Sequence, residues 1–129
     1  MRFALTVALA LGMSGVAQAD GLGDADKGAK IFTQCKGCHQ VGEGASNRIG
    51  PHLNGVFGRA AGSLEDVRYS PSMKRMGSDG LVWDAETLDA YIENPRALVS
   101  KTRMSFRGIK DAEERGDLLA YLRIYSDNP

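Results

Sequence analysis

The chain is most constrained by five consecutive residues, Cys35-Lys36-Gly37-Cys38-His39, which form the pattern C-x-x-C-H. Two thiols at this spacing can each add to one vinyl group of a single haem and form thioethers. The histidine after the second thiol is then held beside the iron, where it can serve as an axial ligand. The chain has two cysteines, and both lie in this motif, so none is left for a structural disulfide or a four-cysteine metal site. The motif predicts a domain built around one covalently bound haem.

Two other kinds of site also use C-x-x-C. A thioredoxin-like redox site requires a strand before the motif and a βαβ sheet around it, and no such pattern precedes Cys35. A tetrahedral zinc site requires four nitrogen or sulfur ligands. Cys35, Cys38, His39 and His52 could supply them, although the adjacent Cys38 and His39 fit one tetrahedron poorly. The sequence therefore favours haem attachment over both alternatives.

The N-terminus has the three parts of a secretory signal. Arg2 supplies a positive charge, residues 3–13 are apolar but too short to span a bilayer, and Ala17-Gln18-Ala19 is an A-x-A cleavage pattern. We expect residues 1–19 to be a cleaved signal peptide and residues 20–129 to be one mature domain in the periplasm. The alternative is an uncleaved N-terminal anchor. Export agrees with the motif, because c-type haem is attached outside the cytoplasm.

The remaining pattern predicts an all-α domain with long loops. We expect helices over residues 25–34, 71–76, 85–94 and 96–99, and a last helix after Asp111 with an acidic variant of the capping box. Glycines punctuate residues 42–63, which show neither helical nor alternating periodicity. Gly28 lies inside the first helix, either where another helix crosses closely or as a tolerated surface glycine. A formal net charge of +0 gives no indication of nucleic-acid binding.

A second axial ligand would have to come from a small set of residues. His52 is the one other histidine, and we interpret it as a polar residue of a proline turn rather than as a ligand. The methionine candidates beyond the signal are Met73, Met76 and Met104. A methionine on the apolar face of a helix is usually part of the core. Met104 differs because it lies in a polar loop between Arg103 and Ser105.

A series of short motifs, in a fixed order along the chain, points to a resemblance to one protein family. They begin with Gly28, Phe32 and C-x-x-C-H, and continue through Gly50-Pro51, Gly55-x-Phe57-Gly58-Arg59, Tyr69, Trp83, Glu86-Thr87-Leu88, Tyr91, Glu93-Asn94-Pro95, Thr102-x-Met104, Phe106, Gly108-Ile109 and Leu119-x-Tyr121-Leu122. With this order and spacing, residues 23 to nearly the C-terminus resemble the class I c-type cytochromes, including the bacterial c-two group. The segment from Tyr69 to Trp83 is longer than in the mitochondrial form, so the resemblance assigns no role to Met73.

The resemblance implies a role for each matching residue. His39 and Met104 match the axial ligands, Cys35 and Cys38 match the thioether attachment points, and the carbonyl of Pro51 would orient His39. The remaining haem contacts would be Arg59, Tyr69 and Trp83 near the propionates, Tyr91 and Thr102 on the methionine side, and Phe106 at the haem edge. Gly28, Phe32 and Tyr121 match the contact of the first and last helices, which favours a close crossing at Gly28.

The implied function is one-electron transfer by a closed His/Met-ligated haem c, not enzymatic catalysis. The protein would act as a monomeric carrier. A quinol-oxidising bc-type complex would donate the electron, and an oxidase, reductase or photosynthetic reaction centre would accept it. The alternative is a haem module dedicated to one dehydrogenase, or a weakly peroxidatic haem protein. Basic residues expected around the exposed haem edge would steer the protein to acidic partners. These are Lys36, Arg48, Arg96, Lys101, Arg103, Arg107 and Lys110.

Overall fold

The computed structural model describes residues 22–126 as helices joined by long loops. The elements are α1 (Ala25–Ile31), the 3-10 helix η1 (Phe32–Gln34), α2 (Pro71–Ser78), α3 (Ala85–Glu93), α4 (Pro95–Leu98) and α5 (Ala112–Ile124). Within the described part, the β structure is one isolated antiparallel bridge between Ala60 and Val82. The all-α prediction is confirmed, whereas the predicted signal peptide lies outside the described residues. None of the helices within residues 22–126 has the length and apolar character needed to cross a bilayer.

Aspartate caps fix where three of the helices begin. Asp24 accepts from the backbone N–H groups of the first turn of α1, and Asp111 does the same for α5 through Glu113 and Glu114. Asp84 forms a reciprocal capping box with Thr87 at the start of α3. Each carboxylate satisfies N–H groups that have no partner within their helix and opposes the positive end of the helix dipole. The predicted helix starts at 25 and 85 are therefore confirmed.

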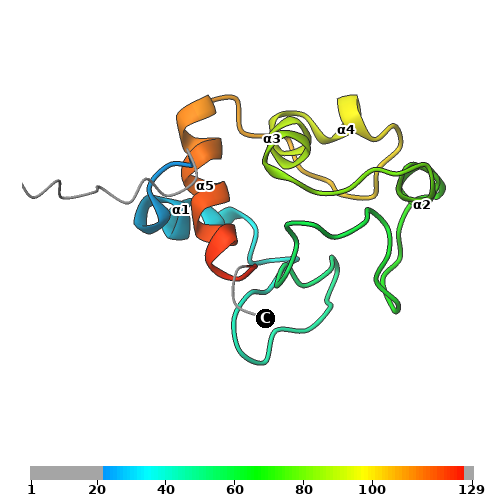
Figure 1. The fold of residues 1–129 in the computed structure, drawn as a ribbon, viewed down its shortest axis with the longest axis horizontal. Coiled ribbons are helices and arrows are strands. Elements are labelled where there is room, and N and C mark those ends of the chain that lie inside the picture. Colours follow the sequence, from blue (N-terminus) through cyan, green and yellow to red (C-terminus); the bar gives the residue numbers. More distant parts are fainter. Residues whose placement is uncertain (1–21, 127–129) are drawn as a thin grey trace, which may run out of the picture.

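Helices α1 and α5 cross closely at one end of the molecule, with α2 at the other end and α3 between them (Figure 1). The crossing depends on Gly28, because a Cβ there would lie 1.9 Å from the Asp117 carbonyl oxygen. The Asp117 side chain also accepts a 2.7 Å hydrogen bond from the backbone of Asp24, just before α1 begins. The structure thus selects close crossing over a tolerated surface glycine.

The long loop from residue 40 to residue 70 is held by backbone hydrogen bonds rather than by secondary structure of its own. Gly55 donates to the Tyr125 carbonyl at the end of α5, at 2.9 Å. Gly58 donates to the Trp83 carbonyl, and Trp83 donates back to Arg59 at 2.9 Å. Both glycines have positive φ, 70° and 89°, a conformation that costs little only without a side chain. The loop is therefore fastened to α5 and to the segment before α3.

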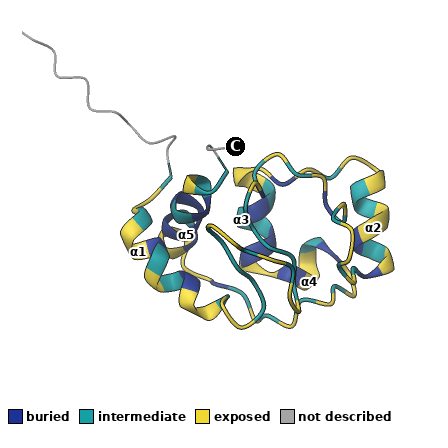
Figure 2. Ribbon diagram, turned by 90° about the horizontal axis from the view of Figure 1, so that it is seen from below, coloured by how far each residue is buried: buried dark blue, intermediate teal, exposed yellow. Residues whose placement is uncertain are grey.

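Buried residues are concentrated on α3 and α5, and others lie on η1, on α2 and in the long loop (Figure 2). The aromatic members pack in tilted pairs, Phe32 with Tyr121 at 5.4 Å and Trp83 with Tyr91 at 5.0 Å between ring centroids. The aliphatic members include Val99, Leu118 and Leu119. This core is modest for its chain length, and much of it borders one large cavity.

Candidate haem site

One cavity of about 310 Å³ lies among η1, α3, α5 and the loops, with a mostly apolar lining. This volume is within the range of pockets that hold organic ligands. The cavity reaches the surface at exposed lining residues such as Ile49, Arg103 and Ser105. Every site residue predicted from the sequence lines this cavity: Cys35, Cys38, His39, Pro51, Arg59, Tyr69, Trp83, Tyr91, Thr102, Met104 and Phe106.

The motif itself forms a tight turn directly after η1. The backbone N–H groups of Cys38 and His39 both donate to the Cys35 carbonyl, at 3.1 and 2.9 Å. This turn brings both thiols, which form no disulfide, and the imidazole to one side of the cavity. Burial, and then the neighbouring Cys38, raise the pKa of the Cys35 thiol to about 11. Burial thus favours the neutral form of the Cys35 thiol while that thiol is free.

The His39 ring is fixed by two backbone contacts. Its Nδ1 lies 2.7 Å from the Pro51 carbonyl oxygen, which only accepts, so Nδ1 carries the proton. In the neutral ring, Nε2 is then left with its lone pair for a metal. The backbone of Gly50 lies close to the ring, since a Cβ there would be 2.5 Å from His39 Cε1. Burial lowers the pKa of His39, which favours the neutral, ligating form.

Met104 lies in the loop between α4 and α5, and one hydroxyl positions it. Thr102 Oγ1 accepts a 3.3 Å hydrogen bond from the Met104 N–H and lies 2.6 Å from the Tyr91 hydroxyl of α3. Burial raises the pKa of Tyr91, so the phenol stays protonated. The Phe106 N–H then donates to the Met104 carbonyl at 3.0 Å, which turns the loop back toward the cavity. The loop therefore presents Met104 to the cavity from the side of α3.

The charged groups that line the cavity are arginines, with no carboxylate among the described lining residues. Arg59 donates to the carbonyls of His52 at 2.9 Å and Asn54 at 2.6 Å, which uses two of the five N–H groups of its guanidinium. Burial lowers the pKa of Arg59 and raises that of Tyr69, which also lines the cavity. Together with Arg68 and Arg103, these groups make the cavity suitable for a ligand that carries negative charge.

Sequence reasoning missed some of the residues that line the cavity. Met73 and Ser70 line the cavity and are 7% and 2% exposed, although neither received a role from the sequence. Ser70 could have been found as the N-cap before Pro71, a signal for the start of a helix. Phe57, one of the motif residues of the family resemblance, lies outside the lining, and its ring stacks with the Arg123 guanidinium at 4.8 Å.

The alternative sites fit the structure less well. Among residues 22–126, no group of three or more His, Cys, Asp or Glu side chains converges as a metal-ion site would require, so the zinc interpretation lacks its ligand set. His52 does not line the cavity, in agreement with its interpretation as a loop residue. Its Nδ1 is buried without a partner in the described region, and burial and the charge of Arg59 lower its pKa.

The donors that converge on the cavity suit a haem. They are two thiols for its vinyl groups, an imidazole nitrogen and a thioether for its iron, and arginines for its carboxylates. A family model described as Cytochrome c matches residues 25–125 of the chain. The chain belongs to the cytochrome c family.

Relatives within this family are bacterial and eukaryotic. The cytochrome c2 of Afifella marina is 52% identical over 98 residues, which cover 76% of this chain and 79% of the relative. The cytochrome c of Stellaria longipes is 44% identical over 102 residues, 78% of this chain and 92% of the relative. The solved structure of cytochrome c2 from Rhodospirillum centenum matches with a TM-score of 0.76 at 36% identity, covering 81% of this chain and 99% of that one.

Membership of the cytochrome c family settles the cofactor and the broad function. The protein carries one covalently bound haem c, and Cys35 and Cys38 have the spacing that attachment requires. It is an electron-transfer protein and not an enzyme. The fold predicted from the sequence, a small class I cytochrome c domain, is confirmed.

Proposed function

We propose that this cytochrome is an exported one-electron carrier whose haem is attached through Cys35 and Cys38 and ligated axially by His39 and Met104. The observation that carries this proposal is the convergence of these four sulfur and nitrogen donors on one apolar cavity. The proposal includes cleavage of residues 1–19 and a single mature domain over residues 20–129. The relatives named cytochrome c2 support a periplasmic location.

When bound, the haem supplies a reversible one-electron change between ferrous and ferric iron. Pro51 fixes the tautomer and orientation of His39, and Thr102 with Tyr91 orients the segment that holds Met104. A neutral thioether favours the ferrous state and so raises the reduction potential relative to a second imidazole. With His39 and Met104 both holding the iron, the protein would leave no position open to oxygen or a substrate.

The lining residues would tune the site further. Buried Trp83, Tyr91 and Leu122 exclude water and raise the cost of the extra positive charge in the ferric state. The Arg59 guanidinium and the side chains of Tyr69 and Trp83 would receive the haem propionates, where a cation and two donors offset buried negative charge. Phe106 would cover the haem edge beside the cavity mouth.

The proposed partners are redox complexes that this carrier meets by diffusion as a monomer. A quinol-oxidising bc-type complex would donate the electron, and an oxidase, a reductase or a photosynthetic reaction centre would accept it. The name cytochrome c2 shared by several relatives supports this class of partner. A haem module dedicated to one dehydrogenase, or a peroxidatic haem protein, is the alternative outcome of the tests below.

The decisive experiment is a spectrum of the oxidised holoprotein, combined with methionine variants. We expect a low-spin spectrum with an iron–thioether charge-transfer band. In Met104→Ala this band disappears, the reduction potential falls, and imidazole binds to the iron. Met76→Ala serves as the control, because Met76 packs against the core but does not line the cavity. A high-spin wild-type spectrum, or an unchanged potential in Met104→Ala, would overturn the proposed ligation.

A further inference from the structure

The segment that carries Met104, residues 100–110, has no helix of its own and is fastened to helices at both ends. At its start, the Ser100 carbonyl accepts a hydrogen bond from the Ser72 hydroxyl of α2. At its end, the Ile109 N–H donates to the Ile92 carbonyl of α3 at 2.9 Å. Gly108 lies directly against α3, since a Cβ there would be 2.1 Å from the Glu93 carbonyl oxygen.

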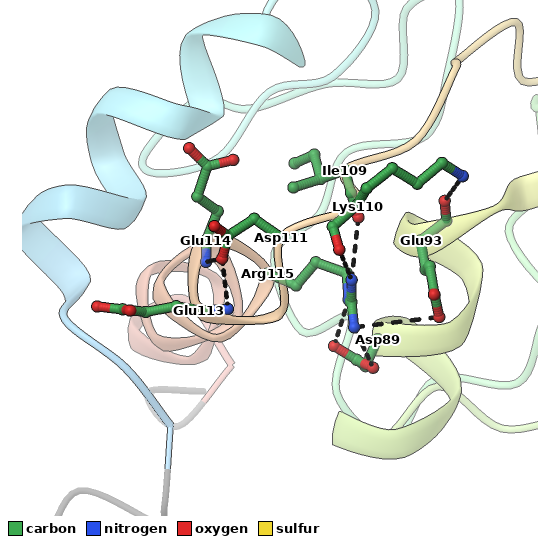
Figure 3. Close-up of polar contacts among 8 residues, drawn as sticks. All are labelled: Asp89, Glu93, Ile109, Lys110, Asp111, Glu113, Glu114 and Arg115. Atoms are coloured by element: carbon green, nitrogen blue, oxygen red, sulfur yellow. Dashed lines mark hydrogen bonds and ion pairs between the residues drawn. The ribbon is translucent and has the colours of Figure 1, made fainter.

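The end of this segment is also held by a buried guanidinium from α5. Arg115 is 7% exposed, and its Nη1 donates to the carbonyls of Ile109 at 3.1 Å and Lys110 at 3.0 Å (Figure 3). Its Nε donates to Asp89 Oδ1 of α3 at 2.8 Å, and its Nη2 lies 4.0 Å from the Glu93 carboxylate. One side chain therefore joins α5, α3 and the end of the methionine segment.

We propose that Arg115 is a positioning residue for Met104: its guanidinium fastens residues 109–110 to α3 and so keeps the methionine segment closed over the cavity. This inference rests on the proposed ligation by Met104, because it concerns how firmly that ligand is held. Arg115 does not line the cavity and acts only through the segment.

The fork of N–H groups on arginine explains why this residue type is required. Two carbonyls and a carboxylate accept from different edges of one planar group, which a single ammonium cannot match. Without the guanidinium, the carbonyls of Ile109 and Lys110 lose their charge-assisted donor, and that of Ile109 loses it in a buried place. The tie of the segment to α3 would then depend on the Ile109 N–H and the Lys110 ammonium, which donates to the Glu93 carbonyl at 2.6 Å.

One residue of the segment has a backbone conformation that works against this fastening. Lys101 has a φ of 58°, in the left-handed region that a residue with a side chain seldom adopts. This conformation is released when the segment opens, so it favours the open state. The contacts at the two ends oppose that release, and Arg115 contributes several of the charged ones.

Amide hydrogen exchange of the reduced and the oxidised holoprotein tests the proposal directly. Arg115→Met replaces the guanidinium with an apolar side chain of similar length. In this variant we expect the exchange rates of the Thr102, Phe106 and Ile109 amides to rise about tenfold relative to that of the Leu122 amide in α5. This factor corresponds to the loss of charge-assisted hydrogen bonds. Arg115→Lys, which retains the charge, gives a smaller increase. Imidazole binding to the ferric protein accelerates in the same order, because binding waits for the segment to open.

Asp24→Ala is the matched control, since it removes the α1 cap and leaves the contacts of Arg115 intact. In Asp24→Ala, the amide exchange rates of the segment and of α5 rise by the same factor. The same uniform rise in Arg115→Met would overturn the proposal and leave Arg115 as a contributor to global stability. If that variant fails to retain its haem, Asp89→Ala releases the guanidinium from α3 at a half-exposed position, and the segment must again exchange faster than α5. A wild-type spectrum without the thioether band refutes the ligation by Met104 independently of these exchange rates.

Discussion

At the scale of single residues, the methionine side of the cavity depends on one oxygen atom. Thr102 Oγ1 bonds both to the Tyr91 hydroxyl and to the Met104 N–H, so it joins α3 to the segment that carries the proposed ligand. Tyr91 is buried, and Thr102 and Met104 are half-buried. If the Thr102 oxygen is removed, the Tyr91 hydroxyl and the Met104 N–H lose their hydrogen-bond partner. They can bond to water instead only if the structure opens.

Thr102→Val tests this dependence, because valine keeps the shape and removes the oxygen. We expect the free energy of unfolding of the holoprotein to fall by about 1–3 kcal/mol, as for buried polar groups left without partners. The measurement is denaturant unfolding followed by haem absorbance. Thr33→Val is the control, since Thr33 Oγ1 bonds only the exposed Lys30 carbonyl, and its change should stay within about 0.5 kcal/mol. Equal losses in the two variants would contradict the assigned role of Thr102.

Single residues of the site differ in how far the sequence could predict them. Cys35, Cys38 and His39 followed from their spacing alone, because the chemistry of attachment is local. Pro51, Thr102 and Met104 required the family resemblance, because their contacts join segments far apart in the chain. Ser70 and Met73 were missed because they belong to the stretch between Tyr69 and Trp83, which is longer than in the mitochondrial form. Only the path of that stretch in space brings them to the cavity.

At the scale of elements, helix starts followed from local sequence patterns, whereas the crossing of α1 and α5 followed only from the family resemblance. Asp24, Asp84 and Asp111 act on N–H groups two or three residues ahead, so a local pattern reveals them. The approach of α1 to α5 is different, because a glycine in a helix looks the same whether or not another helix crosses there. A Cβ at Gly28 would lie 1.9 Å from the Asp117 carbonyl oxygen, which shows that the two helices cross closely there. The crossing is therefore sensitive to the addition of a single methyl group.

Gly28→Ala therefore has a defined consequence. The added Cβ would overlap the Asp117 backbone and force α1 and α5 apart, so we expect a loss of about 1–3 kcal/mol in unfolding free energy, the usual cost of overpacking. The control is Gly116→Ala on the partner helix, where a Cβ would lie 3.7 Å from its nearest neighbour. That variant should be neutral or more stable by up to about 1 kcal/mol, because alanine favours helix. Stability preserved in both variants would rule out the close crossing.

At the scale of the whole molecule, the positions of the charged residues carry information that the net charge does not. The formal net charge is +0, yet the cavity mouth has Arg68 and Arg103 among its exposed residues and no carboxylate in the described lining. Of the basic residues expected at the haem edge, Arg103 lines the cavity, whereas the Lys110 ammonium is engaged by the Glu93 carbonyl. Composition alone could not separate these two, because it contains no information on which basic residues share a face.

Arg103→Gln should therefore alter electron exchange through its location and not through net charge. With ferricyanide as an anionic oxidant, we expect the reduced protein to react about two- to fivefold more slowly at low ionic strength, because one cation near the cavity mouth no longer attracts the reagent. With a cationic cobalt(III) complex, the rate should rise. Both effects should vanish near 1 M salt, where the screening length is about 3 Å. The measurement is stopped-flow oxidation at a series of salt concentrations.

Lys27→Gln is the matched control for this experiment, since it changes the net charge equally from an exposed position on α1. Lys27 borders the groove between α1 and α5 with Asp111 and Glu114, and it does not line the haem cavity. The rate of electron exchange with small reagents falls steeply with their distance from the exposed haem edge. A charge far from that edge therefore affects the rate only weakly, because salt screens its attraction for the reagent. Equal effects of the two substitutions would show that electrons leave without preference for the mouth beside Arg103. An effect confined to Arg103→Gln would identify this mouth as the place where small reagents exchange electrons with the haem.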